Sequence, residues 1–208
     1  MLPVHVVIAG GHGKIALRLT ARLAARADVV TSIIRNPDHR ADVERAGGRP
    51  VVLDLEATTV DDLSQVVRGA DAVVFAAGAG PGSGAARKDT VDRAAAVLLA
   101  EAAGAAGVHR YLLVSSTGVD DPPRPGTDEV WAAYLAAKKA AEDAVRASAL
   151  AWTILRPGAL TDEPGTGRVL LAPPPVERAE VTRDDTAAVL VALLDTPATA
   201  GQILELRE

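Results

Sequence analysis

The sequence predicts an α/β fold in which a mostly parallel, doubly wound sheet carries helices on both faces. Segments typical of strands alternate with segments of helical periodicity along the whole chain. The strand segments are continuous apolar runs, as expected when both faces of a sheet are covered. The chain has 208 residues, 49% of them hydrophobic, which suits one domain with a substantial core. We therefore treat residues 1–208 as a single domain.

The individual elements follow from local patterns. Ile15, Leu19 and Leu23 recur on one helical face, whereas residues 29–34 are a β-branched run. Thr182 is a candidate N-cap, with Asp185 three residues later as a capping-box acid. Strands are expected, in chain order, at 4–9, 29–34, 51–53, 72–76, 110–114, 152–155 and 202–206. Helices are expected at 13–26, 61–68, 89–106, 128–148 and 182–194, with a short polar helix before Gly47.

Loops separate these elements and leave a short C-terminal part. Residues 78–84 are rich in glycine, and residues 118–127 contain three prolines, so both are expected to be loops. Only residues 158–182 remain between the sixth strand and the last helix. We expect this reduced C-terminal substrate segment to form a substrate wall together with residues 118–131.

Composition excludes several classes of function. The net charge is −5 without a basic block, and aromatic residues make up 2%, so nucleic acid is not an expected partner. Cysteine is absent and the four histidines are scattered, so no metal site is expected. No apolar run is long enough to span a membrane, and a strand begins at residue 4 where a signal peptide would lie. We expect a cytoplasmic protein.

A glycine-rich segment joins the first strand to the first helix. It can be read as Gly10-x-x-Gly13-x-x-Ala16 or as Gly11-x-Gly13-x-x-Ala16. In both readings one glycine makes a tight turn, one lets a pyrophosphate approach the backbone, and a small residue lets the helix pack on the strand. Free amides at the helix N-terminus bind the anion. This context predicts a Rossmann-type dinucleotide site with contacts from Gly10, Gly11, His12, Gly13, Lys14 and Ile15, although His12 is equally a solvated loop histidine.

The end of the second strand distinguishes the two nicotinamide cofactors. An acid there binds the ribose 2′-hydroxyl of NAD, whereas an arginine accommodates the 2′-phosphate of NADP. The chain has Arg35-Asn36 at this point and no acid before Asp38. We therefore favour NADP(H), with Arg35 and Asn36 at the ribose. The alternatives are that the cofactor is NAD(H) and that Arg35 is a surface arginine with no role in binding. Asp54, after the third strand, is placed to bind the adenine amino group, and a helix-capping or solvated acid is the alternative.

A tyrosine and a lysine lie four residues apart in the helix after the fifth strand. Tyr134 and Lys138 share a helix face, and an ammonium favours the phenolate form of a nearby tyrosine. Tyr134 can then act as general acid for ketone reduction or as general base for alcohol oxidation. Lys138 can also hold the nicotinamide ribose. The hydroxyl run Ser115-Ser116-Thr117 ends the fifth strand, where open α/β sheets bind their ligands.

These features together resemble the short-chain dehydrogenase/reductase superfamily, in its atypical branch of small NAD(P)H-binding proteins with NmrA-like and epimerase-like members. The resemblance implies that Thr117 is the catalytic hydroxyl and that Ser115 and Ser116 lie nearer the cofactor. It also implies that Pro157-Gly158 lies by the nicotinamide. The motifs that carry it are the glycine loop, Arg35, Asp54-Leu55, Ala76-Ala77-Gly78, Val114-Ser115-Ser116-Thr117, Tyr134-x-x-x-Lys138, Leu155-Arg156-Pro157-Gly158, and Glu163-Pro164-Gly165-Thr166-Gly167.

The expected function is an NADP-dependent oxidoreductase that moves a hydride between nicotinamide and a small carbonyl or alcohol. The catalytic residues would be Thr117, Tyr134 and Lys138. The remaining cofactor contacts would include Leu55, Ala76, Ala77, Gly78, Ser115, Lys138, Pro157 and Gly158. A sugar-nucleotide-type epimerase or dehydratase with bound cofactor, and a non-enzymatic NAD(P)H redox sensor, are the alternatives. A homodimer through the alanine-rich helices is possible, and the substrate is not defined by the sequence.

Overall fold

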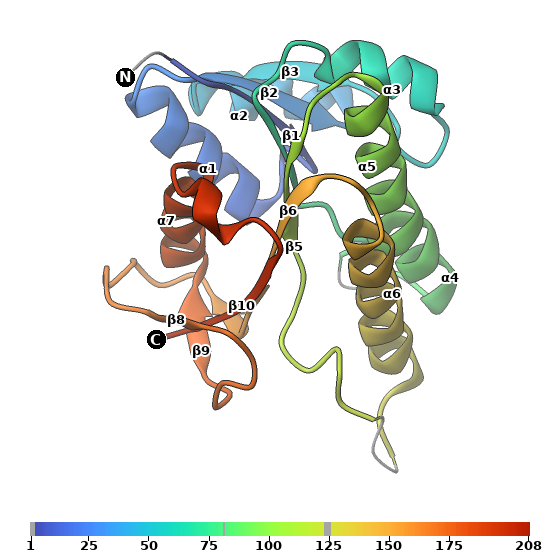
Figure 1. Cartoon of the computed structure of the whole chain (residues 1–208), viewed down its shortest axis with the longest axis vertical. Helices are drawn as coiled ribbons and strands as arrows, with labels where there is room; N and C mark the ends of the chain where they lie inside the picture. The colour runs from blue at the N-terminus through green and yellow to red at the C-terminus, as the bar shows by residue number, and fades with distance from the viewer. Residues whose placement is uncertain (1–2, 81, 123–125) are drawn as a thin grey trace.

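An eight-stranded sheet forms the centre of the protein, with strand order β3-β2-β1-β4-β5-β6-β10-β8 (Figure 1). The computed structural model describes residues 3–80, 82–122 and 126–208. Neighbouring strands pair in parallel except β10 and β8, which pair antiparallel at one edge. The predicted doubly wound, mostly parallel fold is therefore confirmed. The strands of this sheet are β1 (His5–Ala9), β2 (Val29–Ile34), β3 (Arg49–Val52), β4 (Ala72–Phe75), β5 (Arg110–Val114), β6 (Ala151–Pro157), β8 (Leu170–Ala172) and β10 (Gln202–Arg207).

Helices cover both faces of the sheet. In Figure 1, α1 and α7 lie together on one side, and α3, α5 and α6 lie on the other. No helix of the described residues is long and apolar enough to cross a membrane. The helical elements are α1 (Lys14–Ala25), η1 (Pro37–His39), α2 (Arg40–Arg45), α3 (Val60–Val67), α4 (Ala85–Arg87), η2 (Lys88–Ala94), α5 (Ala95–Ala105), α6 (Glu129–Arg146), α7 (Arg183–Leu194) and η3 (Pro197–Thr199).

Each central strand contributes side chains to two hydrophobic cores, one on each face of the sheet. In β1, Val7 packs in the core beneath α3 and α5, whereas its neighbours Val6 and Ile8 pack in the core beneath α1 and α7. In β5, Leu113 and Leu112 divide between the two cores in the same way. Successive side chains of a strand point to opposite faces, so a strand buried on both sides must be apolar throughout. This explains why the strands appear in the sequence as continuous apolar runs.

The structure differs from expectation in two regions. The single helix expected at 89–106 is divided into the π-helical segment η2 and α5, and the short helix α4 precedes them. Residues 158–182 contain three short strands: β8, and β7 (Ala159–Thr161) paired with β9 (Glu180–Thr182). Three residues are too few to show a strand period, and prolines and glycines surround them. Sequence patterns therefore could not distinguish these strands from loop.

Thr182 is the N-cap of α7, as predicted, because its hydroxyl oxygen accepts a hydrogen bond of 2.9 Å from the Asp185 amide. The capping box is not closed, since the Thr182 amide donates to Glu208 instead. The Asp185 carboxylate accepts from the amides of Thr166 (2.7 Å) and Gly167 (3.0 Å). Burial opposes ionisation, but these hydrogen bonds and that from Thr182 keep the pKa of Asp185 below its ordinary value. One buried carboxylate thus fixes the 165–167 turn against α7.

Replacing Asp185 by Ala is expected to leave two backbone amides without their acceptor and to cost about 1–3 kcal/mol of unfolding free energy. The pKa of Asp185 is lowered in the folded protein. Its contribution is therefore present at neutral pH and is lost as the pH falls below its ordinary value of 3.8. Denaturant unfolding at pH 7 and at pH 3 measures both effects. The control is Asp184→Ala, which removes a half-exposed partner of Arg22 and should cost less than about 1 kcal/mol. Equal costs for the two variants at pH 7 would contradict the assignment.

Candidate active site

The loop between β1 and α1 brings the backbone into close approach with the end of β4. Gly10 has φ of +79°, and a Cβ atom there would lie 2.5 Å from Cα of Ala77. Gly13 is the N-cap of α1 and no side chain caps this helix. The first amides of α1 therefore have no partner inside the helix, which suits an anion. The turn, the free helix end and the fully buried Ala16 match the geometry that a pyrophosphate loop requires.

A cavity of about 280 Å³ opens beside this loop, at the carboxyl ends of the first four strands. The strand order reverses between β1 and β4, which is where doubly wound sheets bind nucleotides. Most of the cofactor residues predicted for the adenosine end therefore share one cavity. Its lining includes Gly10, His12, Gly13, Ile34, Arg35, His39, Asp54, Leu55, Glu56, Ala76, Ala77, Gly78 and Arg87.

Arg35 lies at the mouth of this cavity with its side chain 56% exposed, and it pairs with Glu56 at 3.1 Å. Glu56 also accepts hydrogen bonds from Arg87 (2.5 Å) and Thr90 (2.6 Å). These contacts, led by Arg87, hold the pKa of Glu56 below its usual value. Two cations from separate elements therefore converge on one carboxylate at the cavity edge. Glu56 and Arg87 were not singled out by the sequence, because loop acids and arginines are usually solvated surface residues.

Two of the four histidines come together at the same edge. The rings of His12 and His39 stack with centroids 3.5 Å apart, and His12 Nε2 lies 2.7 Å from Asp42 Oδ2. The carboxamide oxygen of Asn36 accepts from the Asp38 amide and caps η1. Among the described residues, no group of three or more potential ligands is arranged for a metal ion.

Three other predicted cofactor residues have partners within the protein. The Lys14 ammonium extends to Asp162, 2.5 Å away in the segment after β7. Ile15 is half-buried against the core beneath α1. Asp54 Oδ1 accepts from the Glu56 amide at 3.0 Å and so stabilises the turn after β3, whereas the next helix, α3, is capped by Thr59. Their side chains therefore organise the loops around the cavity.

Lys138 forms a buried ion pair with Asp92. Its ammonium lies 3.2 Å from Asp92 Oδ1 and donates to the Val114 carbonyl at 3.1 Å. The other Asp92 oxygen accepts from the Ala79 amide at 3.1 Å, in the loop after β4. Asp92 is fully buried and was missed by the sequence analysis. It stands in the polar run of residues 88–93, so no local pattern marks it as buried.

Tyr134 is half-buried on α6, and its ring is close to two ammonium groups. Nζ of Lys138 lies 5.8 Å from the ring centroid and Nζ of Lys88 lies 5.5 Å from it. Trp131, one turn earlier, packs on the ring with a centroid distance of 5.1 Å. The Lys138 ammonium therefore lies close to the Tyr134 ring, as their spacing of four residues in the sequence predicted. Lys88 is a second cation that the sequence analysis did not identify.

The hydroxyl run ends β5 beside β6. The amide of Ser115 donates to Leu155 and that of Thr117 donates to Pro157, which extends the pairing of the two strands. The Ser116 hydroxyl donates to the Thr117 carbonyl. Ser115 Oγ is buried and has no hydrogen-bond partner within the described part of the chain. Since buried hydroxyls are normally satisfied, this one fits a polar group of a bound cofactor.

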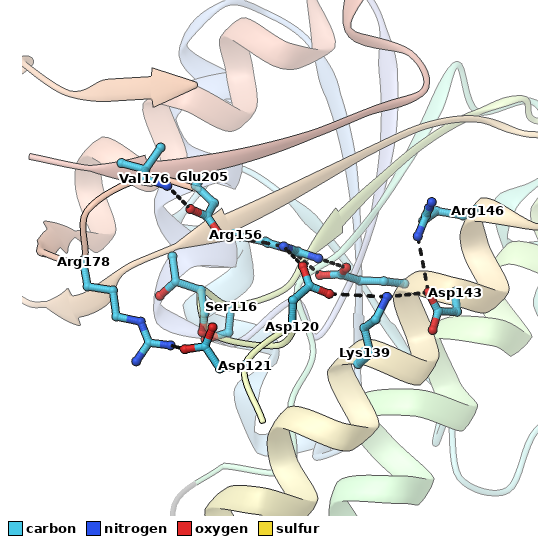
Figure 2. Close-up of polar contacts among 12 residues, drawn as sticks. Ser116, Asp120, Asp121, Lys139, Asp143, Arg146, Arg156, Val176, Arg178 and Glu205 are labelled. Carbon is cyan, nitrogen blue, oxygen red and sulfur yellow. Dashed lines mark hydrogen bonds and ion pairs between the residues drawn. The ribbon is translucent and has the colours of Figure 1, made fainter. Parts of the chain in front are cut away.

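A buried arginine joins the two predicted substrate walls (Figure 2). Arg156 makes a bidentate pair with Glu142 of α6 at 2.9 and 2.6 Å. It also donates to Asp120 of the 118–131 wall at 2.6 Å. Glu205 lies 3.8 Å from Arg156 and accepts from the Val176 amide of the 158–182 wall. Burial opposes the charge of Arg156, but Glu142 and Asp120 hold its pKa above the ordinary value.

The two walls also touch each other directly. Arg178 pairs with Asp121, as Figure 2 shows, and packs over Gly118, whose φ is +85°. At Gly158 a Cβ atom would lie 2.0 Å from the Ala179 carbonyl oxygen, so only glycine allows these backbones to cross. Residues 123–125 of the first wall lie outside the described residues. Val119 and Asp121 of the first wall and Arg178 of the second line one cavity together with residues of α6.

Known proteins share both the sequence pattern and the fold of this chain. Residues 10–197 match the sequence profile of a family described as NAD(P)H-binding. A Bacillus subtilis protein named as an uncharacterized sugar epimerase is 33% identical over 206 residues, covering 99% of this chain and 94% of that protein. A solved structure named for NAD-dependent epimerases/dehydratases, from Bacillus halodurans, is 33% identical with a TM-score of 0.89, covering 98% and 93% of the two chains. An anaerobillin reductase from Escherichia coli O157:H7 is 26% identical with a TM-score of 0.80, covering 98% and 97%.

Replacing Arg156 by Met is expected to leave Glu142 buried without a counter-charge and to cost about 3–5 kcal/mol of unfolding free energy. The control is Arg146→Met, on the same helix as Glu142, which removes a half-exposed partner of Asp143. That change should cost less than about 1 kcal/mol. Urea unfolding of the two variants measures the difference. A cost for Arg156→Met no larger than that of the control would show that the network does not stabilise the fold.

Proposed function

Because the chain belongs to the NAD(P)H-binding family, with the fold of atypical short-chain dehydrogenases/reductases, we propose that it is an NADP-dependent oxidoreductase acting on a small carbonyl or alcohol. The observation that carries this proposal is Tyr134, whose ring lies near the buried Lys138 ammonium. Lys138 in turn contacts the carbonyl of Val114, immediately before the hydroxyl run. An acid/base candidate and its cation thus meet at the carboxyl end of β5.

The described residues fit a dinucleotide along the carboxyl edge of the sheet. The uncapped end of α1 suits the pyrophosphate, and the cavity beside Asp54 and Leu55 suits the adenosine. Ser115 Oγ and Lys138 would hold the nicotinamide end, and Pro157-Gly158 would border it. The cofactor supplies the hydride when it is bound. The protein supplies binding and orientation.

Tyr134 would move the proton. In the direction of reduction its phenol Oη donates a proton to the substrate carbonyl oxygen, and in the direction of oxidation it accepts one from the alcohol. Thr117 would hold that same oxygen by a hydrogen bond. Lys138 would bring its positive charge close to the ring of Tyr134. Because Asp92 and Val114 hold the Lys138 ammonium, this charge is fixed in position rather than mobile.

Arg35 supports NADP over NAD. It stands at the end of β2 and lines the cavity in the place where a 2′-phosphate is recognised. The carboxylate of its partner Glu56 also accepts hydrogen bonds from Arg87 and Thr90. Arg35 can therefore turn towards a phosphate without leaving Glu56 unpaired. A phosphate offers Arg35 a charge-assisted contact in exchange for a largely exposed ion pair.

A second candidate is an epimerase or dehydratase that uses the cofactor transiently. The names of two similar proteins, a sugar epimerase and an NAD-dependent epimerase/dehydratase, favour it. Tyr134 would serve the same proton transfer in that case. The two functions differ in stoichiometry, because an epimerase turns over without net consumption of NADPH. Product analysis with catalytic rather than stoichiometric cofactor separates them.

Tyr134→Phe is expected to lower kcat for reduction of a carbonyl substrate by roughly 10²–10⁴-fold, because the proton donor is lost. The dissociation constant of NADPH, measured by fluorescence titration, should change little. Tyr111→Phe is the matched control, since it also removes a phenol, one that bonds the Ala96 carbonyl in the core. The control should lose about 1 kcal/mol of stability and keep its turnover. Full turnover by Tyr134→Phe would refute the assigned role.

Arg35→Ala is expected to weaken NADPH binding roughly ten- to hundredfold, the equivalent of one charge-assisted hydrogen bond, and to leave NADH binding unchanged. Calorimetric titration with both cofactors measures this ratio. Arg49→Ala, which removes an exposed arginine from the start of β3, at the opposite end of the strands, is the control. A parallel loss of both cofactors, or no loss of either, would show that Arg35 does not read the 2′-phosphate.

A further inference from the structure

Lys88 is a buried ammonium beside the proposed acid/base. The residue is 8% exposed and begins the π-helical segment η2, which packs against α6. Its Nζ donates to the Gly80 carbonyl at 2.9 Å and lies 5.5 Å from the centroid of the Tyr134 ring. Both partners are neutral. A lysine ammonium carries three donors, so these contacts leave hydrogen-bonding capacity and a full charge uncompensated.

The acids nearest to Lys88 in sequence and in the adjoining loop are already paired with other cations. Glu56 pairs with Arg87, Asp89 with Arg93, and Asp92 with Lys138. No ion pair to Lys88 occurs within the described residues. A buried charge without a counter-charge costs free energy that a folded protein normally avoids. Proteins keep such a charged side chain, despite its cost, at sites that bind an oppositely charged group.

The local helix geometry separates Lys88 from its neighbour. Arg87 reaches Glu56 and lines the cavity assigned to the adenosine end. Lys88, one residue later, lies by Tyr134 at the other end of the site. π-helical segments recur at functional sites because the wider turn redirects side chains. Two adjacent cations thus lie at two different parts of the proposed site.

We propose that Lys88 binds an anionic oxygen of the substrate, in a carboxylate or a phosphoryl group. The inference rests on the proposed function, because it places the reacting carbonyl or alcohol at Tyr134. It defines the substrate class as a small molecule in which an anionic group lies a few bonds from the reacting carbon. An anion at this point converts the neutral contacts of Lys88 into a charge-assisted pair in a partly dry site. A neutral substrate of equal shape gains nothing from it.

The first experiment compares turnover of phenylglyoxylate and its methyl ester with NADPH. Lys88→Met should lower kcat/KM for the acid roughly ten- to hundredfold, mainly through KM, and change that for the ester less than about twofold. Lys88→Arg should recover part of the loss. Arg93→Met, which removes an exposed cation from the same segment, is the control and should change neither substrate. An equal loss for acid and ester, or no loss for the acid, overturns the proposal.

The second experiment does not depend on turnover. Calorimetry measures the binding of benzoate, phenyl phosphate and benzamide to the protein saturated with NADP⁺. The wild type should bind one of the two anions at least about tenfold more tightly than benzamide, and Lys88→Met should abolish this preference. The tighter anion identifies the group as carboxylate or phosphoryl. Equal binding of all three probes overturns the proposal.

The two experiments separate this inference from the proposed function. An anion preference that depends on Lys88, without reduction of any carbonyl compound, would refute the oxidoreductase and leave the anion site standing. Carbonyl reduction with no preference for anions would refute the anion site and leave the oxidoreductase standing. Unchanged NADPH affinity and melting temperature in Lys88→Met confirm that the variant is folded.

Discussion

The buried pair of Asp92 and Lys138 is the interaction on which the rest of the site depends. It ties η2 to α6, and through Val114 and Ala79 it also ties the ends of β5 and β4. Removing either partner would leave an uncompensated buried charge, which is far more costly than losing a surface pair. The same contacts fix the ammonium beside Tyr134. A stabilising element of the fold is therefore also the electrostatic setting of the proposed acid/base.

A second charged centre, around Arg156, has a different task. It lies under the two substrate walls and contacts both through carboxylates, Asp120 on one side and Glu205 on the other. Glu142 keeps the guanidinium in place from α6. The walls are loops or very short strands with little core of their own, so their positions depend on this polar centre. The hydrophobic cores stabilise the sheet, whereas buried ion pairs fix the positions of the loops around the site.

The sequence predicted the sheet and its helices well because both cores require continuous apolar strands. The glycine loop and the Tyr134–Lys138 spacing were also readable, since both are local patterns with a geometric meaning. Asp92, Lys88 and Glu56 were not predicted, because each acquires its role from partners on other elements. A lone acid or lysine in a helical segment has no local pattern that reports burial. The π-helical segment that begins at Lys88 was also hidden, because the helix before it has only three residues and the helix after it is regular.

The edges of the sheet have a consequence for how copies of this chain can meet. One edge strand, β3, is short and carries Pro50, which has no amide to offer a neighbouring strand. The other, β8, has three residues and is followed directly by prolines. Short edge strands and proline discourage pairing with a further strand, which is how soluble sheets avoid aggregation. Assembly by extending the sheet is therefore disfavoured at both of its edges.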